Sequence, residues 1–209
     1  MLASLITNGV AQFGLTLSDD QCRQLADYIE LLNKWNKTYN LTAIKAPEKM
    51  VVYHLLDSLA VANYFSADQR QIIDVGAGAG LPGIPLSILF PDKSFTLLDS
   101  NGKKTRFMTQ TKIELGLTNC RVIHDRIERW HPEQHFDVAI SRAFSSIKAF
   151  IASVVHLLRP EGELYAMKGK RPDTELLSLP EQVALQAVWP VQVPHLNEER
   201  HLVILKKVG

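Results

Sequence analysis

The sequence predicts an α/β protein with a mostly parallel sheet, an antiparallel hairpin at one edge and a helical segment before the sheet. From about residue 70 onward, short apolar runs alternate with helical stretches, which is typical of βαβ units. Before that point, apolar residues recur at helical spacing. The runs 185–193 and 201–207 flank a polar connection and indicate the hairpin. We therefore expect a helical segment over 1–65 and a sheet-based domain over 66–209.

Three helices are expected in the first segment, at 2–13, from Ser18 to about Trp35, and from Pro47 to about residue 62. Ser18 and Gln21 fit the capping-box pattern at the start of the second helix. Proline suits the first turn of a helix, so Pro47 indicates where the third begins. The polar stretch 36–40 interrupts the apolar stripe, and the second helix is expected to end there.

In the second part, strands and helices are expected to alternate. The expected strands are 71–75, 94–98, 119–124, 136–141 and 162–168, and the expected helices are 83–90, 101–116, 145–158 and a short one near 173–180. With the hairpin, this gives a seven-stranded sheet. In open α/β sheets, ligands bind beyond the carboxyl ends of the strands. Candidate site residues are therefore those that follow each strand.

Composition limits the function classes. The chain has 209 residues, of which 46% are apolar, and its net charge is +1. It can bury a substantial core, and any nucleic-acid surface must come from local clusters of charge. Cys22 and Cys120 are too far apart for a metal knuckle and fit a reducing compartment. No Lys or Arg precedes residue 23, and no apolar run reaches membrane-spanning length, so we expect a soluble cytoplasmic protein.

Residues 72–83 carry the most informative signal, an apolar strand followed by glycines at alternate positions: Gly76, Gly78 and Gly80. Glycine allows positive φ and a close approach of the backbone to a ligand. The N-terminus of the following helix presents free N–H groups and a partial positive charge. This pattern predicts a nucleotide-like cofactor. The glycines also fit the dinucleotide motif, but Asp74 at the strand end and the preceding helices favour another cofactor.

Residues after the next two strands complete a predicted adenosine site. Asp99 ends the strand 94–98 and can accept hydrogen bonds from both hydroxyls of a ribose. NAD and S-adenosylmethionine both carry such a ribose, so the presence of Asp99 does not distinguish these two cofactors. After the third strand, Ile127 is suited to pack on an adenine face and Glu128 to accept a hydrogen bond from its exocyclic amine.

Motifs spread over nearly the whole chain resemble those of one family. They are the Asp-x-Gly-x-Gly-x-Gly run from Asp74, Lys34-Trp35-Asn36-Lys37 with Tyr39-Asn40-Leu41-Thr42, His54-x-x-Asp57-Ser58-Leu59, Gly80-Leu81-Pro82-Gly83-Ile84-Pro85, Leu98-Asp99-Ser100 with Lys103, and Ile140-Ser141-Arg142-Ala143. They are similar to motifs of the RsmG family, also called GidB, of bacterial 16S rRNA guanine-N7 methyltransferases. The resemblance implies a Rossmann-like class I methyltransferase fold and S-adenosylmethionine as the cofactor. It also implies 16S rRNA or the small ribosomal subunit as the partner, with guanine-527 of the 530 loop as the target.

The resemblance further implies cofactor contacts at five positions: Gly76, Leu81, Ile127, Glu128 and Arg142. Asp74, Gly78 and Asp99 are expected in the same cofactor site because they belong to the glycine motif and the second strand end. Guanine N7 carries a free lone pair at neutral pH, so no general base is required. Alignment alone can remove roughly 7–11 kcal/mol of the barrier to an in-line displacement.

For contacts with the substrate, the sequence offers several candidates for each role. Arg142 and Lys168 are candidates for positioning the base, because Arg142 follows the fourth expected strand and Lys168 ends the fifth. Phe144, Tyr165 or Trp35 is a candidate for stacking on it, although Trp35 lies on an apolar stripe and a core role is favoured. Three basic groups are candidate phosphate contacts: Lys103, Lys104, Arg106 and Lys112; Lys168, Lys170 and Arg171; Lys34, Lys37 and Lys45.

Two other functions stay open, an NAD(P)-dependent oxidoreductase that uses the same glycines and a non-catalytic RNA-binding module. His54, Asp57 and Ser58 share one helix face and predict a hydrogen-bonded seam between the helical segment and the sheet. The run 131–135 has the wrong order of His and Glu for a zinc-protease helix, so no metal is expected. No long heptad suggests an oligomer, and a monomer is expected.

Overall fold

The computed structural model of the protein describes residues 2–208. Its strands are β1 (Gln71–Val75), β2 (Ser94–Asp99), β3 (Cys120–His124), β4 (Phe136–Ser141), β5 (Leu158–Lys168), β6 (Val183–Pro190) and β7 (His201–Lys207). They form a seven-stranded sheet in the order β3-β2-β1-β4-β5-β7-β6. β1 to β5 are parallel, and β7 is antiparallel to both β5 and β6. The predicted mostly parallel sheet with its antiparallel hairpin is confirmed.

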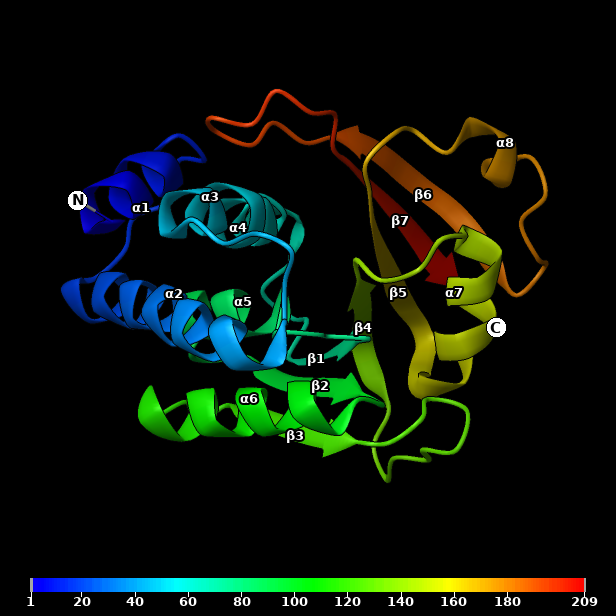
Figure 1. Ribbon diagram of the computed structural model, residues 1–209. Helices are drawn as coiled ribbons and strands as arrows, with labels where there is room; N and C mark the ends of the chain where they lie inside the picture. The colour runs from blue at the N-terminus through cyan, green and yellow to red at the C-terminus, as the bar shows by residue number, and fades with distance from the viewer. Residues whose placement is uncertain (1, 209) are drawn as a thin grey trace.

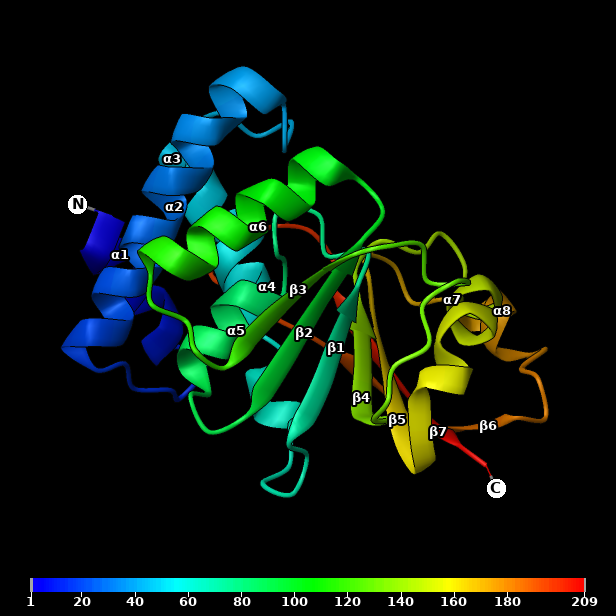
Figure 2. The ribbon, with the colours of Figure 1, turned by 90° about the horizontal axis from the view of Figure 1, so that it is seen from below.

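Helices cover both faces of this sheet (Figures 1 and 2). The α-helices are α1 (Leu2–Ala11), α2 (Asp19–Tyr39), α3 (Pro47–Met50), α4 (Asp57–Leu59), α5 (Gly83–Leu89), α6 (Gly102–Glu114), α7 (Ile147–Val154) and α8 (Asp173–Leu176). A π-helix, η1 (Val51–Leu56), joins α3 to α4, and short 3-10 turns lie at η2 (Ala62–Tyr64) and η3 (Val155–Leu157). Figure 2 shows α2, α5 and α6 on one side of the sheet and α7 on the other.

The two faces of the sheet carry separate hydrophobic clusters. Ile72 belongs to the cluster that includes α1, α2, α5 and α6, while its neighbour Ile73 belongs to the cluster under α7. This alternation follows from the period of two along a strand. The first cluster also contains Ile6, Leu25 and Leu55 from the helical segment. The helical segment and the sheet therefore share one continuous core.

The second helix is longer than its hydrophobic pattern indicates. Its capping box is present, since the Ser18 hydroxyl accepts a hydrogen bond from Gln21 N–H at 3.2 Å and Gln21 Oε1 accepts one from Ser18 N–H at 3.0 Å. The helix continues to Tyr39 and ends at Asn40, where φ is 51°. The helix thus ends within the predicted stretch 36–40, but it passes Asn36, where the apolar stripe breaks, because Asn36 is a buried polar residue. Its side chain bonds the loop that follows, at Thr42 N and Ile44 O.

The strand β5 begins four residues earlier than predicted, at Leu158 instead of residue 162. The pairing register with β4 shifts between Phe136 and Val138, so an irregularity in the ladder accommodates the extra residues. The turn-like sequence Arg159–Gly162 forms this bulge within the strand. The preceding helix is correspondingly shorter, because α7 ends at Val154 and η3 completes the connection. Among residues 2–208, no helix is long and apolar enough to cross a membrane.

Candidate active site

The chain turns sharply between β1 and α5. Gly76 and Gly78 have φ values of +68° and +63°, a conformation that side chains rarely adopt. A Cβ at Gly76 would lie only 2.8 Å from the Cβ of Ala143, which follows β4. At Gly78 the nearest atoms would lie 3.9 Å away or farther. Gly76 therefore allows β4 to approach the turn, whereas Gly78 leaves open space beside the backbone.

Backbone and side-chain acceptors on β2 hold this turn. The N–H groups of Gly76 and Ala77 donate to the carbonyl of Leu98 at 2.8 and 3.1 Å. Gly78 N–H donates to Asp99 Oδ2 at 2.8 Å, and Asn101 N–H donates to Asp99 Oδ1 at 2.8 Å. The Asp99 side chain is 8% exposed. A carboxylate oxygen has two lone-pair sites, so each oxygen can still accept one hydrogen bond from a ligand.

Asp74 supports the turn from the end of β1. It is fully buried, and its Oδ2 accepts a hydrogen bond from Gly83 N–H at the start of α5, at 2.8 Å. Within the described residues 2–208, Oδ1 has no hydrogen-bond partner. Burial raises the pKa of Asp74 to about 7, because a buried carboxylate loses its hydration. The contacts of Asp74 fix the shape of the turn.

A cleft of about 340 Å³ opens at the carboxyl ends of β1, β2 and β3, and we call it the glycine cleft. Its lining includes Gly76, Asp99, Ile127, Glu128, Ala143 and Phe144. The volume falls within the range of small-molecule sites, roughly 300–1,000 Å³. Ile127 is buried and Glu128 is exposed. The sequence-predicted residues Gly76, Asp99, Ile127 and Glu128 thus come together along this cleft, with Gly78 bonded to its wall.

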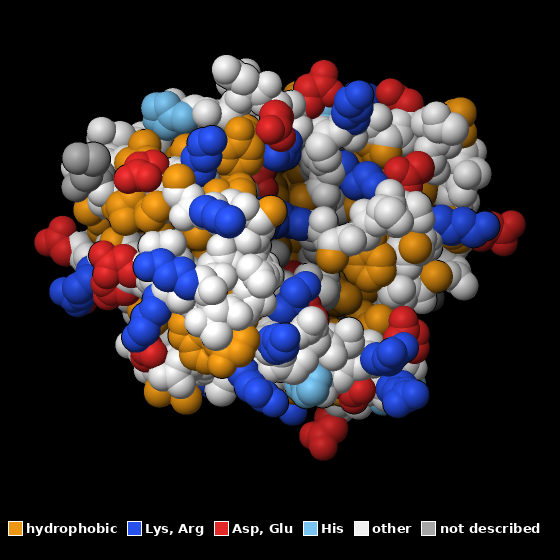
Figure 3. All heavy atoms as spheres, viewed as in Figure 1, with side chains coloured by type: hydrophobic (Ala, Val, Ile, Leu, Met, Phe, Trp, Pro, Cys, Tyr) orange, Lys and Arg blue, Asp and Glu red, His pale blue; other side chains and the backbone are white. Residues whose placement is uncertain are grey.

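A second cleft of about 370 Å³ lies beside the first, between the helical segment and the hairpin. We call it the arginine cleft, and it is lined among others by Tyr53, His54, Asp57, Arg142, Lys168 and Arg200. Arg142 and Ala143 are consecutive at the end of β4, and they line different clefts. The two clefts therefore flank the same strand end. Figure 3 shows Lys and Arg side chains around the hollow in the middle of this face.

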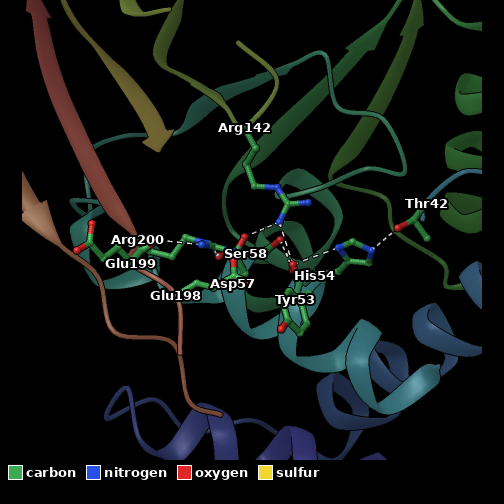
Figure 4. A network of polar contacts seen from close by, with 9 residues as sticks. All are labelled: Thr42, Tyr53, His54, Asp57, Ser58, Arg142, Glu198, Glu199 and Arg200. Carbon is green, nitrogen blue, oxygen red and sulfur yellow. Dashed lines mark hydrogen bonds and ion pairs between the residues drawn. The ribbon is translucent and has the colours of Figure 1, made fainter. Parts of the chain in front are cut away.

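Two residues that were expected to contact the cofactor do not line the glycine cleft. Leu81 lies in the glycine turn with its side chain buried in the first core cluster, and Arg142 lines the arginine cleft. Arg142 Nη1 donates to Asp57 Oδ2 at 2.6 Å and to the carbonyl of Tyr53 at 3.5 Å. Arg200 Nε donates to the other oxygen of Asp57 at 2.8 Å (Figure 4). Asp57 therefore forms the predicted seam between the helical segment and the sheet, whereas the hydrogen bonds of His54 and Ser58 stay within the helical segment. Sequence reasoning missed Arg200, which sits in a polar loop and reaches the site only through the fold.

His54 is held neutral in the arginine cleft. Its Nε2 lies 2.7 Å from Thr42 Oγ1, and its Nδ1 lies 3.1 Å from the carbonyl of Tyr53. Burial and the charge of Arg142 lower the pKa of His54 to about 4. A neutral ring with its proton on Nδ1 satisfies both contacts. Both nitrogens are engaged, and the Ser58 hydroxyl bonds the carbonyl of His54 within the same helix.

Lys168 lines the same cleft from the end of β5. Its Nζ donates to the carbonyl of Ser145 at 2.9 Å and lies 3.2 Å from Glu175 Oε1. An ammonium group has three N–H donors, so one can still face a ligand. The loop that carries α8 therefore holds Lys168 at the edge of the cleft.

The three aromatic candidates have different positions. Tyr165 is 1% exposed and its hydroxyl donates to the carbonyl of Tyr64, so the expectation that it stacks on a base was wrong. Trp35 packs against Phe107 with ring centroids 5.7 Å apart, in the core role that its stripe favoured. Phe144 remains the candidate for stacking on the base, since its side chain lines the glycine cleft. Within residues 2–208, no three His, Cys, Asp or Glu side chains are grouped so as to hold a metal ion.

Comparison with known families decides the class of protein. A family model described as "GidB: rRNA small subunit methyltransferase G" matches residues 21–203. The chain belongs to the GidB family. It is similar to proteins named "Ribosomal RNA small subunit methyltransferase G" from Stutzerimonas stutzeri, with 49% identity over 99% of this chain and 96% of the relative, and from Yersinia pseudotuberculosis, with 50% identity over 92% and 93%.

Solved structures agree on the fold. The N-methyltransferase NodS from Bradyrhizobium japonicum, in complex with S-adenosyl-L-homocysteine, matches 89% of this chain and 100% of its own, with a TM-score of 0.56 and 14% identity. TrmN from Thermus thermophilus matches 72% of this chain and 47% of its own, with a TM-score of 0.54 and 18% identity. This GidB-family chain is a small-subunit rRNA methyltransferase, and S-adenosylmethionine is the cofactor of that class.

The glycine cleft fits this cofactor. Asp99 keeps lone pairs that a ribose can use, Ile127 offers an apolar surface for an adenine, and Gly78 leaves room beside the backbone. The oxidoreductase considered from the glycine pattern is set aside, because the family is one of methyltransferases.

Proposed function

We propose that this chain transfers a methyl group from S-adenosylmethionine to N7 of a guanine in 16S rRNA, and that the guanine is guanine-527 of the 530 loop. The observation that carries the proposal is the pair of clefts that flank the end of β4. One suits a nucleoside cofactor, and the other is lined by cations that suit RNA. A methyl donor in the first cleft and a base beside Arg142 would meet at the strand end that the two clefts share.

Cofactor contacts are proposed along the glycine cleft. Asp99 accepts hydrogen bonds from the ribose hydroxyls, Ile127 packs on the adenine, and Glu128 accepts from its exocyclic amine. Gly76 and Gly78 bring the backbone close to the cofactor. Leu81 and Asp74 hold the turn in the conformation that this requires. Arg142, at the boundary of the two clefts, binds an anionic group.

The reaction needs alignment more than proton transfer. Guanine N7 attacks with its own lone pair, so we assign no general base. The titratable side chains of the arginine cleft support this, because His54 is neutral with both nitrogens engaged and Asp57 is held by two arginines. The chain contributes by holding the two reactants in line and by placing positive charge near the substrate.

Arg142 and Lys168 are proposed to position the base. Arginine commonly reads N7 and O6 of guanine together, but here N7 must stay free for the methyl group. We therefore assign Lys168 to O6 alone, while Arg142 positions the reactants through the anionic group that it binds. Phe144 lines the glycine cleft at the strand end that both clefts share, and we propose that it stacks on the base where the base approaches the methyl donor, because RNA-binding proteins commonly hold unpaired bases on aromatic side chains.

The helical segment 1–65 and the methyltransferase domain 66–209 both contribute to this site, through Asp57 and Arg142 respectively. We propose that the protein acts as a monomer, without a metal, in the cytoplasm where its ribosomal substrate is found.

The test is incubation of the protein with a labelled methyl donor and small ribosomal subunits that lack the modification, followed by nuclease mapping. Label on N7 of guanine-527 is expected. Label on another base, or none, would overturn the proposal. Parallel incubation with naked 16S rRNA distinguishes free RNA from an assembled particle as the substrate.

A further inference from the structure

One carboxylate connects three segments that are far apart in the sequence. Asp57 begins α4 in the helical segment, Arg142 follows β4, and Arg200 immediately precedes β7. Asp57 Oδ2 accepts from Arg142 Nη1 at 2.6 Å, and Asp57 Oδ1 accepts from Arg200 Nε at 2.8 Å. Figure 4 shows both guanidinium groups directed at this carboxylate. Each arginine therefore uses a different oxygen of the same side chain.

The burial of this network makes its pairing obligatory. The Asp57 side chain is 7% exposed, while those of Arg142 and Arg200 are 22% and 21% exposed. A buried charge that loses its partner is strongly unfavourable. Burial acts to lower the pKa of Arg200, but the carboxylates of Asp57 and Glu198 more than offset this and hold its pKa above the ordinary value.

The two arginines differ in the donors that they leave free. Arg200 uses all three of its nitrogens, because Nε bonds Asp57, Nη1 bonds the carbonyl of Glu199 at 2.8 Å, and Nη2 bonds Glu198 Oε2 at 3.1 Å. The contacts of Arg142 within residues 2–208 use Nη1 alone. Its Nε and Nη2 can therefore bind a ligand, with the planar geometry that suits two adjacent anionic oxygens.

We infer that Asp57 and Arg200 are positioning residues for Arg142, through a chain of contacts that runs from Glu198 to Arg200, Asp57 and Arg142. Arg142 is the member that touches the ligand, and Arg200 fixes the carboxylate that orients it. This inference rests on the proposed function, since the ligand of Arg142 is a group of the methylation reaction. It extends the site to the loop before β7.

The shared chemistry of that ligand is an anionic group with two exposed oxygens. The carboxylate of the cofactor's methionine part and a phosphate of the RNA both provide it. Binding of the cofactor alone, compared with the KM for the ribosomal subunit, distinguishes these two sources.

The test is a double-mutant cycle between two arginines that both bond Asp57. Arg142→Gln, Arg200→Gln and the double variant are compared with Arg159→Gln as a matched control. Arg159 Nε contacts Asp137 Oδ1 at 2.6 Å in the same manner, but near the start of β4 and β5, at the opposite end of the sheet. Calorimetry gives the affinity for S-adenosylmethionine, and labelled methyl transfer to unmodified small subunits gives kcat and KM. Thermal unfolding is recorded for every variant.

Arg142→Gln is expected to lower cofactor affinity or kcat/KM for the subunit by roughly 10- to 100-fold, the scale of a hydrogen bond to a charged group. Arg200→Gln should lower the same parameter by about 10-fold in the wild-type protein and by less than about 2-fold when Arg142 is already replaced. Arg159→Gln should change neither parameter by more than about 2-fold. A loss in cofactor affinity identifies the carboxylate, and a loss confined to the KM for the subunit identifies a phosphate.

Equal losses from Arg200→Gln in both backgrounds would overturn the inference, as would an equal loss from Arg159→Gln. If Arg200→Gln does not fold, Glu198→Gln at the exposed end of the chain of contacts takes its place in the same cycle, with an expected loss of about 2- to 3-fold that disappears when Arg142 is replaced. If the wild-type protein methylates no subunit, the proposed function fails, while cofactor affinity still tests the positioning. Absent methylation together with unchanged cofactor affinity would overturn both.

Discussion

The glycine cleft and the arginine cleft lie side by side, but they are built in different ways. The glycine cleft is formed by residues that directly follow consecutive parallel strands, and backbone hydrogen bonds from Gly76 and Ala77 to Leu98 hold it. The arginine cleft is formed by three distant segments whose side-chain charges meet at Asp57. The comparison teaches that a short motif predicts a site whose wall is local backbone. A site made of ion pairs between distant segments requires the fold.

The comparison predicts that the glycine cleft responds most strongly to the loss of Asp99. Asp99→Ala removes an acceptor for Gly78 N–H and Asn101 N–H together with the proposed ribose contacts. Because hydrogen bonds to charged groups contribute about 1.5–3 kcal/mol each, affinity for S-adenosylmethionine should fall by roughly 100-fold in calorimetry. Asp125→Ala is the control, because Asp125 lines the same cleft and, among residues 2–208, accepts a hydrogen bond from its neighbour Arg126 alone. A loss below about 3-fold would remove Asp99 from the cofactor site.

A backbone substitution should damage the same cleft somewhat less. At Gly76, a side chain meets both the positive φ and the Cβ of Ala143 at 2.8 Å. Gly76→Ala should lower cofactor affinity by roughly 10- to 30-fold, since strained backbone costs on the order of 1–3 kcal/mol. Gly116 is a matched control, with φ of +65° and open space around it. Equal losses of cofactor affinity in Gly76→Ala and Gly116→Ala would show that strain alone, and not the approach of β4, matters.

A substitution at Asp74 separates the hydrogen bond that shapes the glycine turn from the buried charge of the carboxylate. Its pKa is raised from 3.8 to about 7 in the folded protein, so its contribution to stability is greatest at low pH and is lost as pH rises through about 7. Asp74→Asn keeps an acceptor for Gly83 N–H without the buried charge. One pKa unit corresponds to about 1.4 kcal/mol, so the rise from 3.8 to about 7 corresponds to roughly 4 kcal/mol. Asp74→Asn should therefore raise Tm by roughly 10 °C at pH 8 and hardly at pH 4. An equal change of Tm at both pH values would contradict this explanation.

The smallest expected effect tests whether the helical segment supports the glycine cleft. The Tyr28 hydroxyl on α2 donates to the carbonyl of Ala79 in the glycine turn at 2.8 Å, and burial raises its pKa, so it remains a donor. Tyr28→Phe removes only this bond, which contributes about 1 kcal/mol. Calorimetry should show a loss of cofactor affinity of about 3- to 5-fold. Tyr39→Phe, at an exposed position, is the control, and indistinguishable affinities for the two variants would rule out this support.

Much of the fold and of the glycine cleft could be predicted because the determinants are local. Strand alternation, the capping box of Ser18 and the glycine turn depend on residues that are close in sequence. The continuation of α2 past Asn36 could not be predicted, because that polar side chain is satisfied by a loop that folds back on it. Arg200 was missed for a related reason. A polar loop carries no sequence signal of its place in the fold. The order of the strands β5, β7 and β6 brings Arg200 to Asp57.

Two glutamines on α2 affect how the protein unfolds on heating. Gln21 Nε2 bonds the carbonyls of Ile88 and Leu89 at the end of α5, and Gln24 Nε2 bonds the carbonyl of Leu115 after α6. Each glutamine thus completes the last turn of a helix that lies against the sheet, where the final carbonyls of a helix lack partners of their own. A fragment that begins at residue 66 would leave these helix ends open and a large apolar face exposed. We expect it to aggregate, and we expect the intact chain to unfold on heating in one cooperative transition.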